Sequence, residues 1–409
     1  MNNFFKIILL FTITITIVSC SKSDSSSTPL RDYTTQRDTD MTSIETYMHT
    51  HYMTVDQSPG ETNQDVTFTL IPVGGTQISI WDQTTYPILT RYVKVRQNDV
   101  DVTYKMYYIQ LRQGSGPNSK SPSNVDRVLT SYRGEYIYTN TVTTTDTPPV
   151  TTSTITSKQF EESINPQGFF NLTGVIRGWS EIFPQFKTGS YTGNTDGTVS
   201  YNDFGAGVMF IPSGLAYFGN STGGIPSYSP LIFSFKLYEV QRLDHDGDGI
   251  YSYQEDLGTS IVSPDGTVTN TAGVPDGYMY TLPEGVANID NTDDGTPILQ
   301  PDGSYKYEEV PDFLDIDDDG DHYTTASEIK YKNPLDPEHL ERYYPYNGAA
   351  MDDPSTPYVD ERKGVPRMFT GPNNGNGHPT SNDPSDFTEP TRLRRYLDPV
   401  AKPIYSDQE

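Results

Sequence analysis

The stretch VIRGW, Val175–Trp179, stands between two strand-like runs in the middle of the chain. Gly174 to Trp179 indicates a turn that leads into a short helix, which we expect to run from Trp179 to Phe186. Apolar residues recur at helical spacing after the turn, namely Trp179, Ile182, Phe183 and Phe186. The pattern predicts one short helix that turns Trp179 toward a sheet.

Short blocks on both sides of this stretch match one protein family in the same order. They are Ser131-Tyr132-Arg133-Gly134, Phe160-Glu161-Glu162-Ser163, Phe170-Asn171-Leu172, Phe210-Ile211-Pro212 with Ala216-Tyr217, Gly224-Ile225-Pro226, and Leu231-Ile232-Phe233. With VIRGW, they make the chain from about Val128 to Val240 resemble the FKBP-type peptidyl-prolyl cis-trans isomerases. The resemblance implies an α+β domain in which an antiparallel β-sheet wraps around one short helix.

The resemblance also implies a pocket for proline-containing polypeptides, with Trp179 as its floor. The family's pocket residues carry over to Tyr132, Phe160, Glu161, Phe170, Val175, Ile176, Trp179, Tyr217, Ile225 and Phe233. Amide resonance gives the X-Pro bond a rotation barrier near ~20 kcal/mol, so a catalyst needs only to bind the twisted amide more tightly than the planar forms. An aromatic cup can strip water from the imide, and Tyr217 or a backbone N–H can donate to its carbonyl. We expect an isomerase that needs no cofactor and assists the folding of exported proteins.

The chain departs from the family pattern at several positions. Glu161 replaces the usual Asp, and Phe218 separates Tyr217 from Gly219. Two insertions, Thr139 to Thr156 and Thr188 to Asn202, lengthen loops that could cover the pocket, and we expect the first to be a long loop. A catalytically weak or inactive chaperone or adhesion module that binds the same peptides is therefore the alternative.

Strand and helix signals precede this domain. Thr42 to Glu45 resembles a capping box and predicts a short helix, while Val66–Leu70 and Val102–Gly114 have strand-like patterns. The expected organisation is a signal peptide at 1–20, a tether, short helix and β-rich flank at 21–114, the isomerase domain at 115–242, a loop-rich acidic calcium-loop region at 243–346 and an irregular tail at 347–409.

The first twenty residues indicate export. An apolar run from Ile7 to Val18 follows Lys6 and is too short to span a bilayer comfortably. It ends at Ser19 and Cys20, the only cysteine, in a pattern that resembles a lipoprotein signal box. An ordinary signal peptide with a coincidental cysteine is the alternative. We expect lipidation at Cys20 and anchoring in the outer membrane of a Gram-negative cell envelope, as in flavobacterial (Bacteroidetes) lipoproteins.

The negative charge is concentrated in one segment. The chain carries 28 Lys and Arg against 54 Asp and Glu, a net charge of -26, which argues against a nucleic-acid partner. Between Gln241 and Asp360 there are 27 of these acids and only five basic residues. Cations are the favoured ligands there, and the oligomeric state stays open.

The segment contains two candidate calcium loops of the EF-hand kind. In the first, every diagnostic position fits, with ligands at Asp244, Asp246, Asp248, Ile250, Ser252 and Glu255. In the second, His322 replaces the expected Gly, and the ligands would be Asp317, Asp319, Asp321, Tyr323, Thr325 and Glu328. The surrounding Asp-rich sequence resembles thrombospondin type 3 repeats. We expect structural Ca²⁺, with an acidic loop that holds no ion as the alternative.

Overall fold

The computed structural model describes residues 29–56, 66–98, 100–255, 258–272, Tyr278 and short segments between 291 and 343. The signal segment with Cys20 and the tail after residue 343 lie outside the described residues. The chain divides into one unit from Met1 to Asp32 and a second from Tyr33 to Glu409. The fold described below belongs to the second unit.

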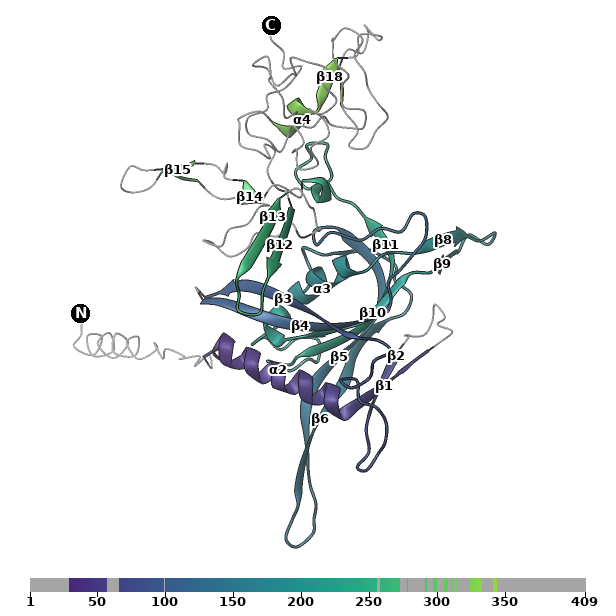
Figure 1. The fold of residues 1–409 in the computed structure, drawn as a ribbon, viewed down its shortest axis with the longest axis vertical. Coiled ribbons are helices and arrows are strands. Elements are labelled where there is room, and N and C mark those ends of the chain that lie inside the picture. The colour runs from purple at the N-terminus through teal and green to yellow at the C-terminus, as the bar shows by residue number, and fades with distance from the viewer. Residues whose placement is uncertain are drawn as a thin grey trace, which may run out of the picture. The chain divides into compact units, whose positions relative to one another are not determined.

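An antiparallel sheet of seven strands forms the body of this unit (Figure 1). The order is β3-β4-β10-β11-β5-β6, with β7 paired to β5. The strands are β3 (Ile88–Gln97), β4 (Val100–Arg112), β5 (Arg127–Thr143), β6 (Thr151–Ser163), β7 (Phe170–Asn171), β10 (Gly205–Ile211) and β11 (Leu231–Gln241). The expected boundary at residue 115 falls inside this sheet, because β4 pairs with β10. The β-rich flank therefore supplies two strands of the same sheet.

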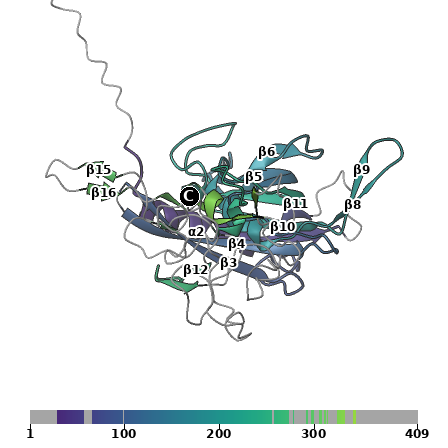
Figure 2. The same cartoon turned by 90° about the horizontal axis from the view of Figure 1, so that it is seen from above.

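Each face of the sheet is covered by one helix (Figures 1 and 2). On β10, Met209 and Ile211 face a core that contains α3 (Arg177–Ile182) and the 3₁₀ turn η1 (Phe183–Gln185). Val208 and Phe210 face the opposite core, which contains α2 (Tyr33–Thr50). Alternate residues of a strand point to opposite faces, so one apolar strand serves both cores.

Helix α2 is longer than the sequence predicted. The expected start at Thr42 is wrong, because the helix begins at Tyr33. The Thr42 hydroxyl donates to the carbonyl of Asp38 at 2.9 Å, which is a contact made inside a helix rather than at a cap. Ile44, Tyr47 and Met48 are buried against the sheet, and this tertiary contact stabilises a helix that starts in polar sequence.

Both inserted segments are hairpins. The segment Thr139–Thr156, expected to be a loop, instead continues β5 and β6. The two strands stay paired with each other as far as Thr143 and Thr151. Hydroxyl contacts link the strands, including Thr143 to Thr151 at 3.0 Å, and β-branched threonine suits an extended chain. The second insertion forms the hairpin of β8 (Ser190–Gly193) and β9 (Val199–Asn202).

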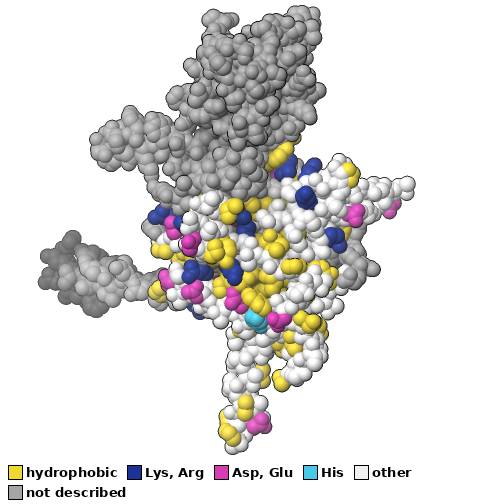
Figure 3. Space-filling view, in the orientation of Figure 1, with side chains coloured by type: hydrophobic (Ala, Val, Ile, Leu, Met, Phe, Trp, Pro, Cys, Tyr) yellow, Lys and Arg dark blue, Asp and Glu magenta, His cyan; other side chains and the backbone are white. Residues whose placement is uncertain are grey.

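The other elements of the described chain are short. They are β1 (His51–Val55), β2 (Val66–Leu70), η2 (Ser213–Leu215), η3 (Ser252–Gln254), β12 (Gly258–Val262), β13 (Val268–Ala272), β14 (Asn291–Thr292), β15 (Pro297–Leu299), β16 (Tyr305–Tyr307), β17 (Val310–Pro311), α4 (Thr325–Glu328), β18 (Lys330–Lys332) and β19 (Glu341–Tyr343). Of the helices in the described ranges, none is both long and apolar enough to cross a bilayer. On the face drawn in Figure 3, acidic and basic side chains are interspersed.

Candidate functional site

Trp179 lies on α3 and is only 4% exposed. Four aromatic rings meet its indole edge to face, with centroid distances of 5.0 Å to Tyr132, 5.2 Å to Phe233, 5.4 Å to Phe183 and 5.5 Å to Phe170. Among the described residues, no hydrogen-bond acceptor meets the indole Nε1. Aromatic packing therefore fixes the position of the ring.

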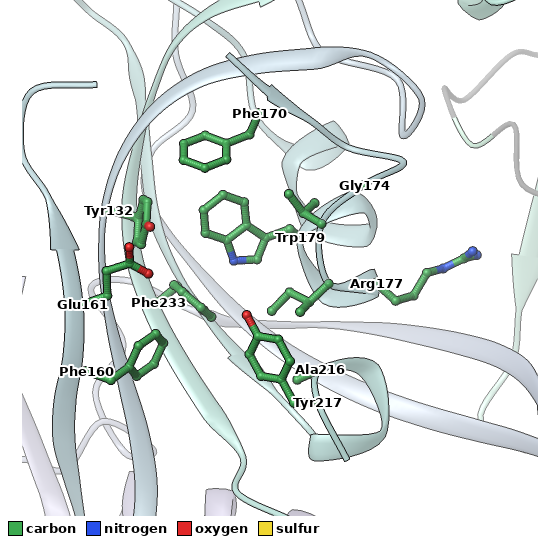
Figure 4. Close-up of a pocket in the computed structure, with 12 residues that line it drawn as sticks. Tyr132, Phe160, Glu161, Phe170, Gly174, Arg177, Trp179, Ala216, Tyr217 and Phe233 are labelled. Atoms are coloured by element: carbon green, nitrogen blue, oxygen red, sulfur yellow. The ribbon is translucent and has the colours of Figure 1, made fainter. Parts of the chain in front are cut away.

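A cavity of about 690 Å³ opens over this indole (Figure 4). Its lining residues are Tyr132, Phe160, Glu161, Phe170, Gly174, Val175, Ile176, Arg177, Trp179, Ala216, Tyr217 and Phe233. They come from four strands, from α3 and the turn before it, and from the turn after η2. The volume and the predominance of apolar side chains are typical of a small-ligand site.

Two glycines in the matched blocks give the aromatic rings and the helix their space. A Cβ at Gly134 would lie 2.4 Å from the Phe160 ring and 2.9 Å from the Phe233 ring. A Cβ at Gly178 would lie 2.5 Å from the Ile211 side chain, so glycine lets α3 approach β10. The need for glycine at both positions is therefore steric.

The cavity contains hydroxyl groups beside one carboxylate. Glu161 accepts a hydrogen bond from Tyr132, and the Tyr217 hydroxyl points into the cavity (Figure 4). Burial, reinforced by the charge of Glu161, raises the pKa of Tyr132 and of Tyr217 above the ordinary value. Both tyrosines are therefore protonated donors at neutral pH.

Arg177 lines the cavity, but its guanidinium is engaged elsewhere. Its Nε lies 2.7 Å from Glu181, which Arg91 also contacts at 2.7 Å. Burial alone would raise the pKa of Glu181, but the two arginines outweigh it and lower the pKa. Figure 4 shows the Arg177 side chain directed away from the aromatic rings. The cavity is therefore an aromatic cup with neutral donors and one carboxylate at its wall, which suits a compact apolar ring attached to a carbonyl.

The structure gathers nearly all the predicted pocket residues at this cavity. Those that line it are Tyr132, Phe160, Glu161, Phe170, Val175, Ile176, Trp179, Tyr217 and Phe233. Ile225 is not among the lining residues, although it is buried in the same core as Trp179. Gly174, Arg177 and Ala216 were missed, although each stands within or beside a matched block.

The inserted hairpins do not cover the cavity. Residues 139–156 and 188–202, all of them described, contribute none of its lining residues. In each hairpin the added residues pair with one another, and both hairpins extend outward from the body of the sheet (Figure 1).

A second candidate site lies at Asp244, Asp246 and Asp248. Their carboxylates offer oxygens that all lie within 4.8 Å of one another. Gly247 and Gly249 donate to Asp244 at 2.6 and 3.2 Å, and Gly249 has a φ of 106°, which favours glycine. The loop thus brings three predicted ligands to one point.

The environment of these carboxylates opposes their charge. Burial and the charge of Asp248 raise the pKa of Asp246 to about 7, and burial raises that of Asp248 to about 6. Asp248 is 7% exposed, and its Oδ2 has no hydrogen-bond partner within the described residues. Such a group is stabilised by a positive charge.

The other predicted ligands are described only in part. Ile250, Ser252 and Glu255 follow the aspartates in the sequence, and all three side chains are buried. Thr325, from the second loop, opens α4 and hydrogen-bonds Asp248. Asp317, Asp319, Asp321, Tyr323 and the side chain of Glu328 lie outside the described residues.

Two comparisons with known proteins gave matches. A family model described as "BamM C-terminal" matches residues 245–358, a span that covers most of the acidic segment. No match was found among curated proteins.

Among solved structures, the chain has a partial likeness to FKBP-type domains. A peptidyl-prolyl cis-trans isomerase from Pseudomonas syringae is 25% identical over 34% of this chain and 76% of its own, with a TM-score of 0.23. FkpA from Escherichia coli is 25% identical over 33% of this chain and 48% of its own, with a TM-score of 0.22. The N-terminal domain of FKBP42 from Arabidopsis thaliana is 14% identical over 33% and 86%, with a TM-score of 0.21.

Proposed function

We propose that this chain binds proline-containing polypeptides in the Trp179 cavity and isomerises their X-Pro bonds. The observation that supports this function is the aromatic cup itself, in which rings from separate strands surround one indole beneath a hydroxyl donor. The proline ring would lie on Trp179, between Phe160 and Phe170, and the preceding carbonyl would reach toward Tyr217.

Such a site lowers the barrier by binding, without covalent chemistry. The planar amide owes its ~20 kcal/mol barrier to a charge-separated resonance form, which an apolar cup disfavours by excluding water. The Tyr217 hydroxyl is a protonated donor because burial and Glu161 raise its pKa. A hydrogen bond that forms only with the twisted carbonyl lowers the barrier without tightening ground-state binding.

A protease-coupled assay on an X-Pro peptide tests the function. Tyr217→Phe removes one hydroxyl and should lower kcat/KM up to roughly tenfold, because a hydrogen bond contributes up to about 1.4 kcal/mol, which corresponds to a factor of about ten. Tyr191→Phe is the matched control, since Tyr191 is 64% exposed on β8 and outside the cavity. A folded wild type that binds the peptide without accelerating isomerisation would instead indicate the chaperone or adhesion module.

We also propose that the loop from Asp244 to Glu255 holds a Ca²⁺ ion. The specific support is the approach of three carboxylates within 4.8 Å, together with the buried and unsatisfied Oδ2 of Asp248. Oxygen donors of this kind are those that Ca²⁺ prefers, and Gly249 permits the sharp turn of the loop. The second loop, with its Thr325 contact to Asp248, would complete the region.

Isothermal titration of the full chain with CaCl₂ tests this site. Asp248→Asn should weaken binding at the first loop, while Asp146→Asn, on the exposed β5–β6 hairpin, should not. Equal affinity in the Asp248→Asn variant and the wild type would contradict the assignment.

The proposed cellular setting rests on the N-terminal sequence. We propose that Cys20 is acylated and anchors the chain in the outer membrane, where its clients would be exported polypeptides. Metabolic labelling with a radioactive fatty acid should mark the wild type and not Cys20→Ala. Equal labelling of both would indicate that Cys20 is not the modified residue.

A further inference from the structure

The turn that carries Tyr217 is anchored to helix α2. Asp40 of this helix is 1% exposed, and its Oδ2 accepts hydrogen bonds from the backbone N–H and the hydroxyl of Ser213, at 2.7 and 2.6 Å. Gln36 donates to the other carboxylate oxygen of Asp40 at 2.6 Å. Ser213 opens η2, four residues before Tyr217. The helix therefore holds the start of the turn by charge-assisted hydrogen bonds.

The same helix also holds the residue after Tyr217. The Tyr33 ring stacks on Phe218 at 4.3 Å with an interplanar angle of 20°. Phe218 has a φ of 46°, in the left-handed region that a bulky side chain rarely adopts. It is also the additional residue between Tyr217 and Gly219. The inserted aromatic thus supplies the ring to which α2 docks.

Within the described residues, Tyr217 itself belongs to no helix or strand. It follows η2, and the N–H of Phe218 closes the turn on the carbonyl of Ser213 at 2.9 Å. Asp40 therefore holds Ser213 and Tyr33 holds Phe218, and the hydrogen bond between Ser213 and Phe218 closes the turn that contains Tyr217. The contact between Asp40 and Ser213 joins residues that lie 173 positions apart in the sequence.

We propose that Asp40 and Tyr33 are positioning residues for the cavity, and that helix α2 sets the placement of the Tyr217 hydroxyl. This proposal rests on the proposed isomerase function and extends it to a helix on the opposite face of the sheet. A hydroxyl that must meet a carbonyl only in its twisted form is sensitive to small displacements, and the most that a displacement can cost is the whole contribution of its hydrogen bond.

The first experiment measures hydrogen exchange in the full chain. Tyr33→Ala should speed exchange of the Phe218 and Tyr228 amides, which bond to the carbonyls of Ser213 and Phe218, and leave the amides shared by β10 and β11 unchanged. Tyr33→Phe keeps the stacked ring and should restore protection. Unchanged exchange in Tyr33→Ala would overturn the proposal, whatever the activity of the protein.

The second experiment is a double-mutant cycle on kcat/KM. Tyr33→Ala should lower kcat/KM roughly tenfold through kcat, and combining it with Tyr217→Phe should add little, because the helix acts through the Tyr217 hydroxyl. Ser213→Ala should behave as Tyr33→Ala does. Additive losses would overturn the positioning role. An inactive wild type whose exchange still responds to Tyr33→Ala would remove the isomerase function and leave the anchoring intact.

Discussion

The Trp179 cavity and the Asp244 loop are two candidate ligand sites built on opposite principles. The cavity brings neutral rings together from strands that are separated in the sequence and from η1, and these rings pack with their centroids 5.0 to 5.5 Å from the indole. The loop takes its carboxylates from one short run of sequence and holds them within 4.8 Å, where burial raises the pKa of Asp246 and Asp248. The cavity therefore keeps its shape through packing among its own rings, whereas the loop concentrates negative charge that a bound cation would offset.

The largest expected effect comes from removing the floor of the cavity. Trp179→Ala leaves four rings without their shared contact and should lower the free energy of unfolding by about 3–5 kcal/mol. Urea denaturation measures the loss, and peptide binding should disappear with it. Trp81→Ala is the comparison variant, because Trp81 packs against Tyr107 in the other core. A loss below about 1 kcal/mol would mean that the rings pack without the indole.

A smaller effect is expected from removing the cation. Saturating Ca²⁺ at about 100 times its Kd should stabilise the loop by about 2.7 kcal/mol, and a chelator should remove that gain. Limited proteolysis of the segment after Gln241, with and without chelator, reports the difference. Peptide binding at Trp179 should survive chelation. Cleavage that is equally slow in both conditions would argue for an acidic loop without an ion.

The smallest expected effect is that of pH on the cavity. The pKa of Tyr132 and that of Tyr217 lie above the ordinary value, so their contribution to stability is complete below about pH 10 and is lost as pH rises through the folded values. Both hydroxyls thus remain donors between about pH 6 and about pH 9. Peptide affinity, followed by Trp179 fluorescence in a Trp81→Phe background, should change less than about twofold over that range. A larger change in peptide affinity between about pH 6 and about pH 9 would mean that a group other than these tyrosines donates the hydrogen bond to the peptide.

The two sites also differ in how far they could be predicted. The spacing of Asp244, Asp246 and Asp248 with Gly249 is a local pattern, and the structure brings the three carboxylates together as expected. The cavity was predicted only through matched blocks, and Ile225 was placed in it wrongly because a buried apolar residue near a pocket is not distinguished by sequence from one that faces the pocket.

The misassigned elements have related physical causes. The threonine-rich segment at Thr139–Thr156 has the polarity of a loop, but threonine is β-branched, and cross-strand pairing makes the segment a hairpin. Helix α2 starts at Tyr33, before any capping signal, because its buried face packs on the sheet and Asp40 binds Ser213. In α2 the local signals were outweighed by contacts with residues far away in the sequence, whereas in the hairpin the β-propensity of threonine and pairing with a neighbouring strand outweighed its polarity.

The sequence alone determined the features set by short-range chemistry. These are the strand alternation at Val66–Leu70 and the order of oxygen donors in the Asp244 loop. Only the tertiary structure decided how the aromatic rings are oriented around Trp179 and that α2 holds the turn of Tyr217. Contacts between residues far apart in the sequence, such as Asp40 and Ser213 at 173 positions, depend on how the sheet packs against its helices. This follows from the packing of the whole domain rather than from any local pattern.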